Sequence, residues 1–395
     1  MMTTQCCKDG MSEKVDYIDT PDALNQLSAQ LRHSDFIAVD TEFFREKTYL
    51  PQLCLIQIAT NSVLAIIDPL VLTNLEPLWE ILCNSEITKV LHSGRQDLEI
   101  FYELCGRPIA PLFDTQIAAT LLGHGDQVGY GALIAAECKI HLDKAHTRTD
   151  WTARPLDAGQ LRYAADDVRY LAIVYPLIQK RLEQDGRLSW LKEDFLALSN
   201  PAGYGTAPTE AWRRVHGAQA LQGRSFVLLQ RLAAWREQQA RVKNLPRRWI
   251  ISDATLLELA RHSPVNQDHL RKIQGMEPGI MKHYGQELLK LLRAEKEGNT
   301  SSPQTLPSHS ALTMEQEALV DCLLAVVRLQ CVAHRVSLAS LTSRRDLEAL
   351  ISGETNIPLL HGWRRALAGQ AVLDILKSQI NLSVMEGQLR LEIRK

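Results

Sequence analysis

The feature of this sequence that most restricts its fold is an alternation of strand-like and helical segments that stops near residue 195. The segments FIAVD (36–40), LCLIQIAT (53–60) and VLAIID (63–68) are short, apolar and rich in branched residues, as strands are. Amphipathic segments follow, and the longest runs from about Ala158 to Leu182. The alternation predicts an α/β domain with helices packed on a sheet, and the tight break at 60–62 indicates an antiparallel start.

Beyond residue 208 only helical periodicity remains, apart from the last segment. LSVMEGQLRLEI, close to the C-terminus, has the alternation and turn residues of a β-hairpin. Polar linkers rich in Pro, Gly or Ser separate the blocks. The predicted organisation is a flexible tail (1–16), an α/β domain (17–200), a helical domain (209–295), a linker (296–313) and a second helical domain (314–395).

Composition excludes several classes of protein. The chain has 395 residues, 45% of them hydrophobic and 23% charged, which is ordinary for a globular protein. It has no apolar run near the roughly 20 residues that span a bilayer, and its N-terminus has no apolar secretory segment. Eight scattered cysteines lack the spacing of a zinc site, so we expect reduced thiols in a cytoplasmic protein, with Cys6 and Cys7 on the tail.

The net charge of −2 conceals a split between the parts of the chain. Residues 201–300 contain 16 Lys and Arg against 9 Asp and Glu, a local balance of +7, so the remainder carries −9. An acidic part joined to a basic part is a feature of some nucleic-acid-binding proteins.

The first candidate site is the pair Asp40 and Glu42, at the end of the apolar strand FIAVDTEF. Strand side chains alternate between faces, so both carboxylates point the same way. Two like charges about 4 Å apart repel by roughly 4 kcal/mol at an effective dielectric constant of 20. Most isolated Asp-x-Glu pairs are solvated loop charges, but this position favours a cation site, and oxygen ligands alone favour Mg²⁺ or Mn²⁺.

Two further acidic positions are candidates. One lies where a strand is followed by a helix, and the other lies on a late helix. Asp97 stands at the start of the helix that follows the strand-like segment TKVLHS. The simpler interpretation is an acid in the first turn that the helix dipole favours, and this interpretation fits Glu99 equally well. In LRYAADDVRYL, Tyr163 and Asp167 are four residues apart and share a helix face, whereas Asp166 is rotated by about 100°.

Taken together, these motifs resemble the DEDD superfamily of 3′→5′ exonucleases, and the tyrosine marks its DEDDy branch. The segments DTEFFREKTYLPQLCLIQIA, LHSGRQDLEIF, FDTQIAATLLG, LDKAHTRTDWTARPL and YAADDVRYL look like the ribonuclease D family over residues 20–190. The blocks at about 210–294 and 315–380 resemble the HRDC helical module, the first more clearly than the second. The resemblance implies a ribonuclease-H-like mixed-sheet exonuclease domain followed by two all-α helical-bundle domains.

The resemblance also implies the roles of individual residues. Asp40, Glu42, Asp97 and Asp167 would bind two divalent cations, Mg²⁺ or Mn²⁺, and Tyr163 would orient the attacking water. The reaction would release nucleoside 5′-monophosphates from RNA with a free 3′ end, such as tRNA precursors and other small structured RNAs. Six further residues are candidates for binding the substrate: Thr41, Phe43, His92, Arg95, Arg247 and Arg248.

Two alternative functions stay open at this level. A DNA 3′ exonuclease of repair or proofreading type would need the same acids, because they do not distinguish ribose from deoxyribose. A nucleic-acid-binding adaptor without turnover would retain the fold, although the presence of all five key residues argues against it. We expect a monomer with no membrane association.

Overall fold

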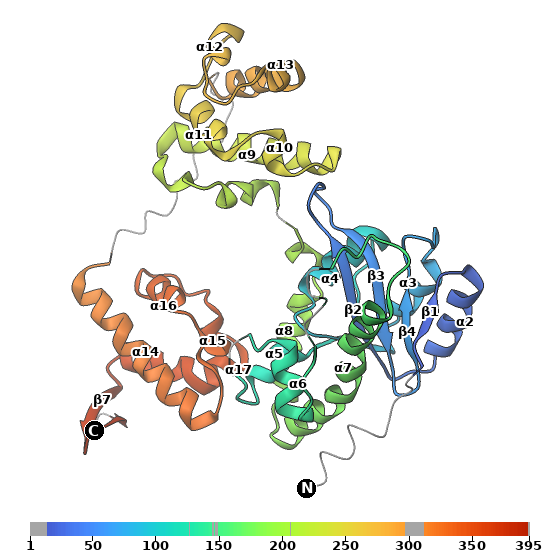
Figure 1. The fold of residues 1–395 in the computed structure, drawn as a ribbon. Helices are drawn as coiled ribbons and strands as arrows, with labels where there is room; N and C mark the ends of the chain where they lie inside the picture. Colours follow the sequence, from blue (N-terminus) through green and yellow to red (C-terminus); the bar gives the residue numbers. More distant parts are fainter. Residues whose placement is uncertain are drawn as a thin grey trace. The chain divides into compact units, whose positions relative to one another are not determined.

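The computed structural model describes residues 14–125, 127–143, 146, 149–205, 207–296 and 312–393. Contacts divide the chain into two compact units (Figure 1). The first unit contains Met1–Glu42, Cys54–Ala202 and His309–Lys395, and the second contains Phe43–Leu53 and Gly203–Ser308. The predicted tail, with Cys6 and Cys7, and the predicted linker at 296–313 lie almost wholly outside the described residues. No helix in the described ranges is long and apolar enough to cross a membrane.

The first unit is built on a mixed sheet of six strands, and a mixed sheet is what the family resemblance implied. Its strands are β1 (Asp16–Ile18), β2 (Phe36–Phe44), β3 (Gln52–Ala59), β4 (Leu64–Ile67), β5 (Thr88–Leu91) and β6 (Leu112–Asp114), and their order is β1-β4-β3-β2-β5-β6. Strands β3 and β4 are antiparallel, which confirms the predicted start, whereas β2–β5, β5–β6 and β1–β4 are parallel. The strands β1 and β6 were not predicted, because three residues are too few to show a period.

Helices α2 (Pro21–Leu31), α3 (Glu76–Leu82), α4 (Arg95–Cys105), α5 (Thr115–Thr120), α6 (Tyr130–Cys138), α7 (Ala158–Gln184) and α8 (Leu191–Leu198) accompany the sheet. The long helix α7 packs on β4 and β5 (Figure 1). It begins at a capping box, in which the Asp157 carboxylate accepts from the amide of Gln160 and the Gln160 side chain accepts from that of Asp157. Its apolar stripe, including Val168 and Leu171, is buried at helical spacing.

The first unit also contains a second helical block, with α14 (Met314–His334), α15 (Leu338–Leu341), α16 (Arg344–Ile351), α17 (Gly362–Arg364) and α18 (Gln370–Leu376). Within this unit, Arg364 donates to Asp194 of α8 at 2.8 Å, and the rings of Trp190 and Trp363 stack with centroids 5.4 Å apart. The antiparallel pair β7 (Ile380–Met385) and β8 (Gln388–Ile393) follows, which confirms the predicted hairpin.

The second unit is a helical bundle with α9 (Gly223–Lys243), α10 (Arg247–Ile250), α11 (Asp253–His262), α12 (Gln267–Arg271) and α13 (Pro278–Lys296). Leucines at helical spacing, such as Leu229, Leu232 and Leu256, are fully buried in its core. The segment 43–53 adds Tyr49 to this core, and the Tyr49 hydroxyl donates to Glu237 at 2.5 Å. A short segment of the β2–β3 connection is therefore part of the helical unit.

Candidate active site

Strand β2 carries Asp40 and Glu42 at its carboxyl end. The preceding residues Ile37, Ala38 and Val39 are completely or almost completely buried, whereas Asp40 and Glu42 are partly exposed. The strand is therefore anchored in the core by its apolar residues and emerges at a pair of carboxylates. This arrangement agrees with the alternation on which the predicted site was based.

A tight junction after β5 positions the third acid by fixing the start of α4. Ser93 has a positive φ of 59°, and a Cβ atom on Gly94 would lie 2.5 Å from the side chain of Leu91, so only glycine fits there. The Asp114 carboxylate accepts hydrogen bonds from the amides of Ser93 and Gly94 at 3.2 and 2.9 Å. Asp114 is also the N-cap of α5, so it links the starts of two helices.

Asp97 lies in the first turn of α4 and is only 8% exposed. It accepts a hydrogen bond from the hydroxyl of Thr41, the residue between the two acids of β2. Glu99, which local position alone could not distinguish from Asp97, is only partly buried and lies two residues further, about 200° around the helix. The structure therefore brings Asp97, and not Glu99, to the end of β2.

Helix α7 brings Asp167 to the same place, and Tyr163 precedes it by four residues on that helix. Asp167 is among the charges that raise the pKa of both Asp40 and Glu42, whereas Asp166 affects neither of these groups. Instead, Asp166 lies 2.9 Å from Arg169 in an ion pair along the helix. Both aspartates line one cavity, but only Asp167 is among the charges that act on Asp40 and Glu42.

The pKa values of Asp40 and Glu42 respond to the charges of the other acids. Burial, followed by the charges of Asp97, Asp167 and Glu42, holds the pKa of Asp40 well above its usual value. Burial and the charges of Asp167 and Asp97 raise the pKa of Glu42 to about 8. Burial also raises the pKa of Asp97 to about 6 and that of Asp167 to about 7. A partly desolvated cluster of acids with raised pKa values binds cations, because a cation cancels the repulsion.

The chemistry of these donors fits a hard divalent metal ion. All four are carboxylates, and carboxylate oxygens are the usual ligands of Mg²⁺ and Mn²⁺. In the described part of the chain, no three His, Cys, Asp or Glu side chains already stand in a metal-ligand geometry. The cluster therefore has the right ligand types and charge, and metal binding would have to draw the four side chains together.

A cavity of about 190 Å³ opens beside Tyr163 and Asp167, with His146 and Arg162 on its wall. The ring of Tyr163 lies 6.1 Å from those of His146 and Trp151, measured between centroids. Aromatic neighbours on two sides restrict the orientation of the phenol. The side chain predicted to orient water thus lines the same cavity as Asp167.

Arg154 fixes the segment that carries Trp151. Its guanidinium bonds both oxygens of the buried Asp68, at 2.6 and 2.8 Å, and donates to the carbonyl of Trp151 at 2.8 Å. Burial would raise the pKa of Asp68, but hydrogen bonds from Arg154 and Tyr17 outweigh it and lower the pKa. Sequence reasoning missed this anchor, because Asp68 and Arg154 are 86 positions apart.

The residues predicted to bind substrate fall into different environments. Thr41 bonds Asp97, and Phe43 is partly buried on β2. His92 is held by Thr115 and by the carbonyl of Val128, at 3.0 Å from one ring nitrogen each.

The three arginines predicted to bind substrate lie in different environments. Arg95 lines a cavity of about 370 Å³ near Asp194 and Trp363 in the first unit. In the second unit, Arg247 is ion-paired with Glu237 through its Nε atom and one terminal guanidinium nitrogen. Arg248 beside it is exposed.

The site also contains Tyr130, which the sequence-based predictions did not include. Its hydroxyl donates to the carbonyl of Asp166 at 2.9 Å, and its ring lies 5.5 Å from His92. Burial and the charges of Asp167 and Asp40 raise its pKa well above the ordinary value. A second phenol thus adjoins the acids from α6, and nothing in the local pattern GYGALI marks it.

Comparisons with known proteins identify the family models and relatives that this chain matches. A 3′–5′ exonuclease family model matches residues 15–183, and an HRDC domain model matches residues 225–292. Ribonuclease D of Bartonella henselae is 36% identical over 91% of this chain and 90% of its own length. Ribonuclease D of Gluconacetobacter diazotrophicus is 38% identical over 93% of this chain and 94% of its own.

A solved structure extends the likeness to the whole fold. The crystal structure titled Escherichia coli RNase D, an exoribonuclease involved in structured RNA processing, has a TM-score of 0.79 and 32% sequence identity. The match covers 92% of this chain and 99% of that one.

The mixed sheet and the matched exonuclease and HRDC models define a 3′→5′ exonuclease of a metal-dependent class. Within that class, the chain belongs to the ribonuclease D family, as the resemblance of its motifs predicted. It is a 3′→5′ exoribonuclease.

Proposed function

We propose that Asp40, Glu42, Asp97 and Asp167 bind two divalent cations, Mg²⁺ or Mn²⁺, and that Tyr163 positions the attacking water. The observation that carries this proposal is that burial and the charges of Asp97 and Asp167 raise the pKa values of both Asp40 and Glu42, while Tyr163 and Asp167 line one cavity. When bound, the cations would lower the pKa of the water and stabilise the leaving 3′ oxygen.

The residues of the chain would have separate roles in the reaction. The four carboxylates would stay ionised once cations offset their repulsion, and they would hold those cations at the end of β2. An unperturbed phenol has a pKa near 10 and is a weak base at neutral pH. Tyr163 would therefore hydrogen-bond the water and direct it, and Thr41 would hold Asp97 in place through its hydroxyl.

For the substrate, we propose RNA with a free 3′ end, in particular tRNA precursors, from which the enzyme would release nucleoside 5′-monophosphates. The 32% identity to an exoribonuclease described as involved in structured RNA processing supports this substrate class. The basic balance of residues 201–300 supports binding of an RNA backbone. We also propose that residues 314–395 form a second HRDC-like module and that the enzyme is a monomer.

The test is release of mononucleotides from a 3′-labelled tRNA precursor, with Mg²⁺, with Mn²⁺ and with EDTA. Asp40→Asn should reduce cleavage by about a thousandfold or more, equivalent to about 4 kcal/mol of barrier, while binding of the RNA persists. A matched DNA oligonucleotide distinguishes the alternative repair nuclease, which would cleave DNA as fast as RNA. Cleavage that is equally fast in EDTA would contradict the proposal.

A further inference from the structure

The second unit contains a cavity of about 560 Å³ that is lined mainly by arginines. We call it the arginine pocket, and its arginines are Arg45, Arg214, Arg236, Arg247 and Arg248. Arg45 belongs to the segment 43–53, Arg214 ends a short helix at Pro208–Arg214, and the other three come from α9 and α10. The volume lies in the range of about 300–1,000 Å³ that is typical of ligand pockets.

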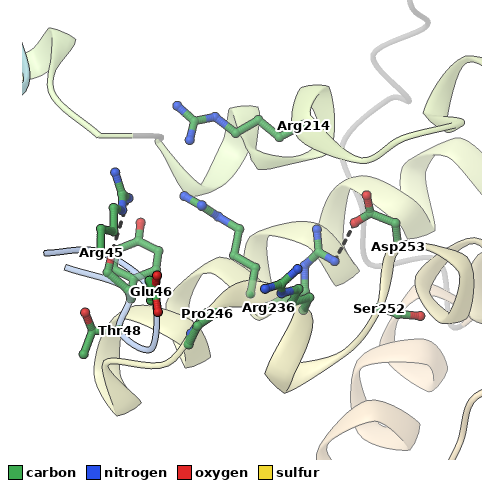
Figure 2. Close-up of a pocket in the computed structure, with 11 residues that line it drawn as sticks. Arg45, Glu46, Thr48, Arg214, Arg236, Pro246, Ser252 and Asp253 are labelled. Carbon is green, nitrogen blue, oxygen red and sulfur yellow. Dashed lines mark hydrogen bonds and ion pairs between the residues drawn. The ribbon is translucent and has the colours of Figure 1, made fainter. Parts of the chain in front are cut away.

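Two of these arginines are already engaged inside the bundle. Arg247 forms a two-pronged ion pair with Glu237, and its guanidinium lies 4.9 Å from the ring centre of Tyr49. Arg236 is 4% exposed and donates to Asp253 at 2.7 Å, a contact drawn in Figure 2. These pairs hold the wall of the pocket and offset much of the charge of the two arginines.

The other three arginines, Arg45, Arg214 and Arg248, are exposed. Among the described residues, none of the three forms an ion pair, and Arg45 donates only to a backbone carbonyl, that of Tyr49. Figure 2 shows Arg45 and Arg214 reaching toward the same open space from different segments. With the two engaged arginines set aside, three cationic groups face a single unpaired acid of the lining, Glu46. The pocket is therefore strongly positive.

A second observation points to a missing acceptor. The Nε atom of Arg236 is buried and has no hydrogen-bond partner among the described residues. A buried charged donor without a partner is unfavourable, and buried donors in folded proteins are nearly always satisfied. Since Arg236 lines the pocket, a small movement of its side chain would bring this Nε–H to an oxygen atom of a ligand bound there.

The chemistry of the lining selects the class of ligand. Guanidinium groups match phosphate oxygens with paired hydrogen bonds, and exposed arginines are common phosphate contacts. Tyr49 is the one aromatic residue of the lining, it is itself buried, and Arg247 covers its ring, so a nucleobase has no free surface for stacking. The pocket is thus suited to a phosphate group and not to a base.

We propose that the arginine pocket is a phosphate-binding site that is separate from the acid cluster. The phosphate belongs either to the backbone of an RNA strand or to a free phosphate monoester such as the released nucleotide. Arg45, Arg214 and Arg248 make the contacts, and Arg236 donates its Nε–H to the same group. Arg247, in contrast, is a structural residue that holds Tyr49 and Glu237. The proposal requires no role for the carboxylates of the catalytic site, so the two can fail separately.

The test measures binding of single-stranded RNA to the full-length protein in EDTA, where cleavage cannot occur, across a salt titration. The variant Arg214→Ala with Arg248→Ala should bind more weakly, and the slope of log K against log salt should fall by about 1.4, or ~0.7 per lost contact. The matched control, Arg213→Ala with Arg271→Ala, removes two exposed arginines of the same unit that lie outside the pocket. Its slope should stay close to that of the unaltered protein.

Two further probes separate the possible sources of the phosphate. Inorganic phosphate and adenosine 5′-monophosphate should each raise the melting temperature of the unaltered protein, but not that of the pocket variant, if the site binds free monoesters. If only RNA binding responds to the variant, the site binds the strand. The single variant Arg248→Ala, which removes a side chain without any described bond, repeats the test with little risk to folding. If the pocket variant and its control respond equally to RNA, to inorganic phosphate and to adenosine 5′-monophosphate, the proposal is overturned.

Discussion

Replacing Glu42 by Gln should stabilise the metal-free protein, and the gain should grow with pH. Burial and the charges of Asp167 and Asp97 raise the pKa of Glu42 from 4.5 to about 8 in the folded chain. The folded state therefore retains a proton that the unfolded state releases at lower pH. The stability that this carboxyl contributes is fully present below about pH 4.5 and is lost as the pH rises toward 8.

The size of the effect follows from the shift. A pKa change of one unit corresponds to about 1.36 kcal/mol, so the loss between pH 4.5 and about pH 8 is on the order of 5 kcal/mol. Glutamine cannot ionise and avoids this loss. For a domain of about 150–250 residues, each 1 kcal/mol shifts the melting temperature by roughly 2–4 °C. The variant should therefore melt about 10 °C or more above the unaltered protein at pH 8 in EDTA.

Calorimetric melting in EDTA at several pH values between 4.5 and 8 measures this difference directly. The control is Glu99→Gln, the same chemical change on α4 at a residue that does not contribute to the raised pKa of Glu42. Adding Mn²⁺ should reverse the order, because the unaltered protein binds the cation better and gains more stability. If Glu42→Gln gains no more than Glu99→Gln over this pH range, the carboxylates do not repel one another as we describe.

Three further predictions concern neighbouring residues. Asp167→Asn should abolish mononucleotide release, whereas Asp166→Asn should retain most of it, because only Asp167 acts on the other acids. Measured kcat values test this, and equal losses in the two variants would contradict the assignment. Arg154→Ala should destabilise the protein by about 3–5 kcal/mol in urea unfolding, because it leaves the buried carboxylate of Asp68 without its cationic partner. A loss below about 1 kcal/mol would show that the ion pair is unimportant. Gly94→Ala should lower stability by about 1–3 kcal/mol and reduce kcat as well, because the new Cβ displaces the start of α4. Unaltered melting and turnover would refute the claim that only glycine fits at this junction.

Local sequence was sufficient for the elements that carry the chemistry. The apolar run ending in Asp40 and Glu42 predicts a buried strand with two carboxylates on one face, and β2 has that form. The four-residue spacing of Tyr163 and Asp167 on a capped helix selects their common face without any knowledge of the fold. These predictions succeed because strand and helix periods are local properties of the backbone. The resemblance of the motifs extended them to a family and a reaction.

Other features depended on contacts between residues far apart in the sequence. The choice of Asp97 over Glu99 required the direction in which α4 leaves β5, which Gly94 and Asp114 determine together. The position of Tyr130 beside the acids and the grouping of segment 43–53 with a helical bundle have no local signature. Hydrophobic periodicity reports which face of an element is buried, but not which partner buries it. Only the tertiary structure brings these distant side chains to one point, because packing across the sheet and within each bundle decides which of them meet.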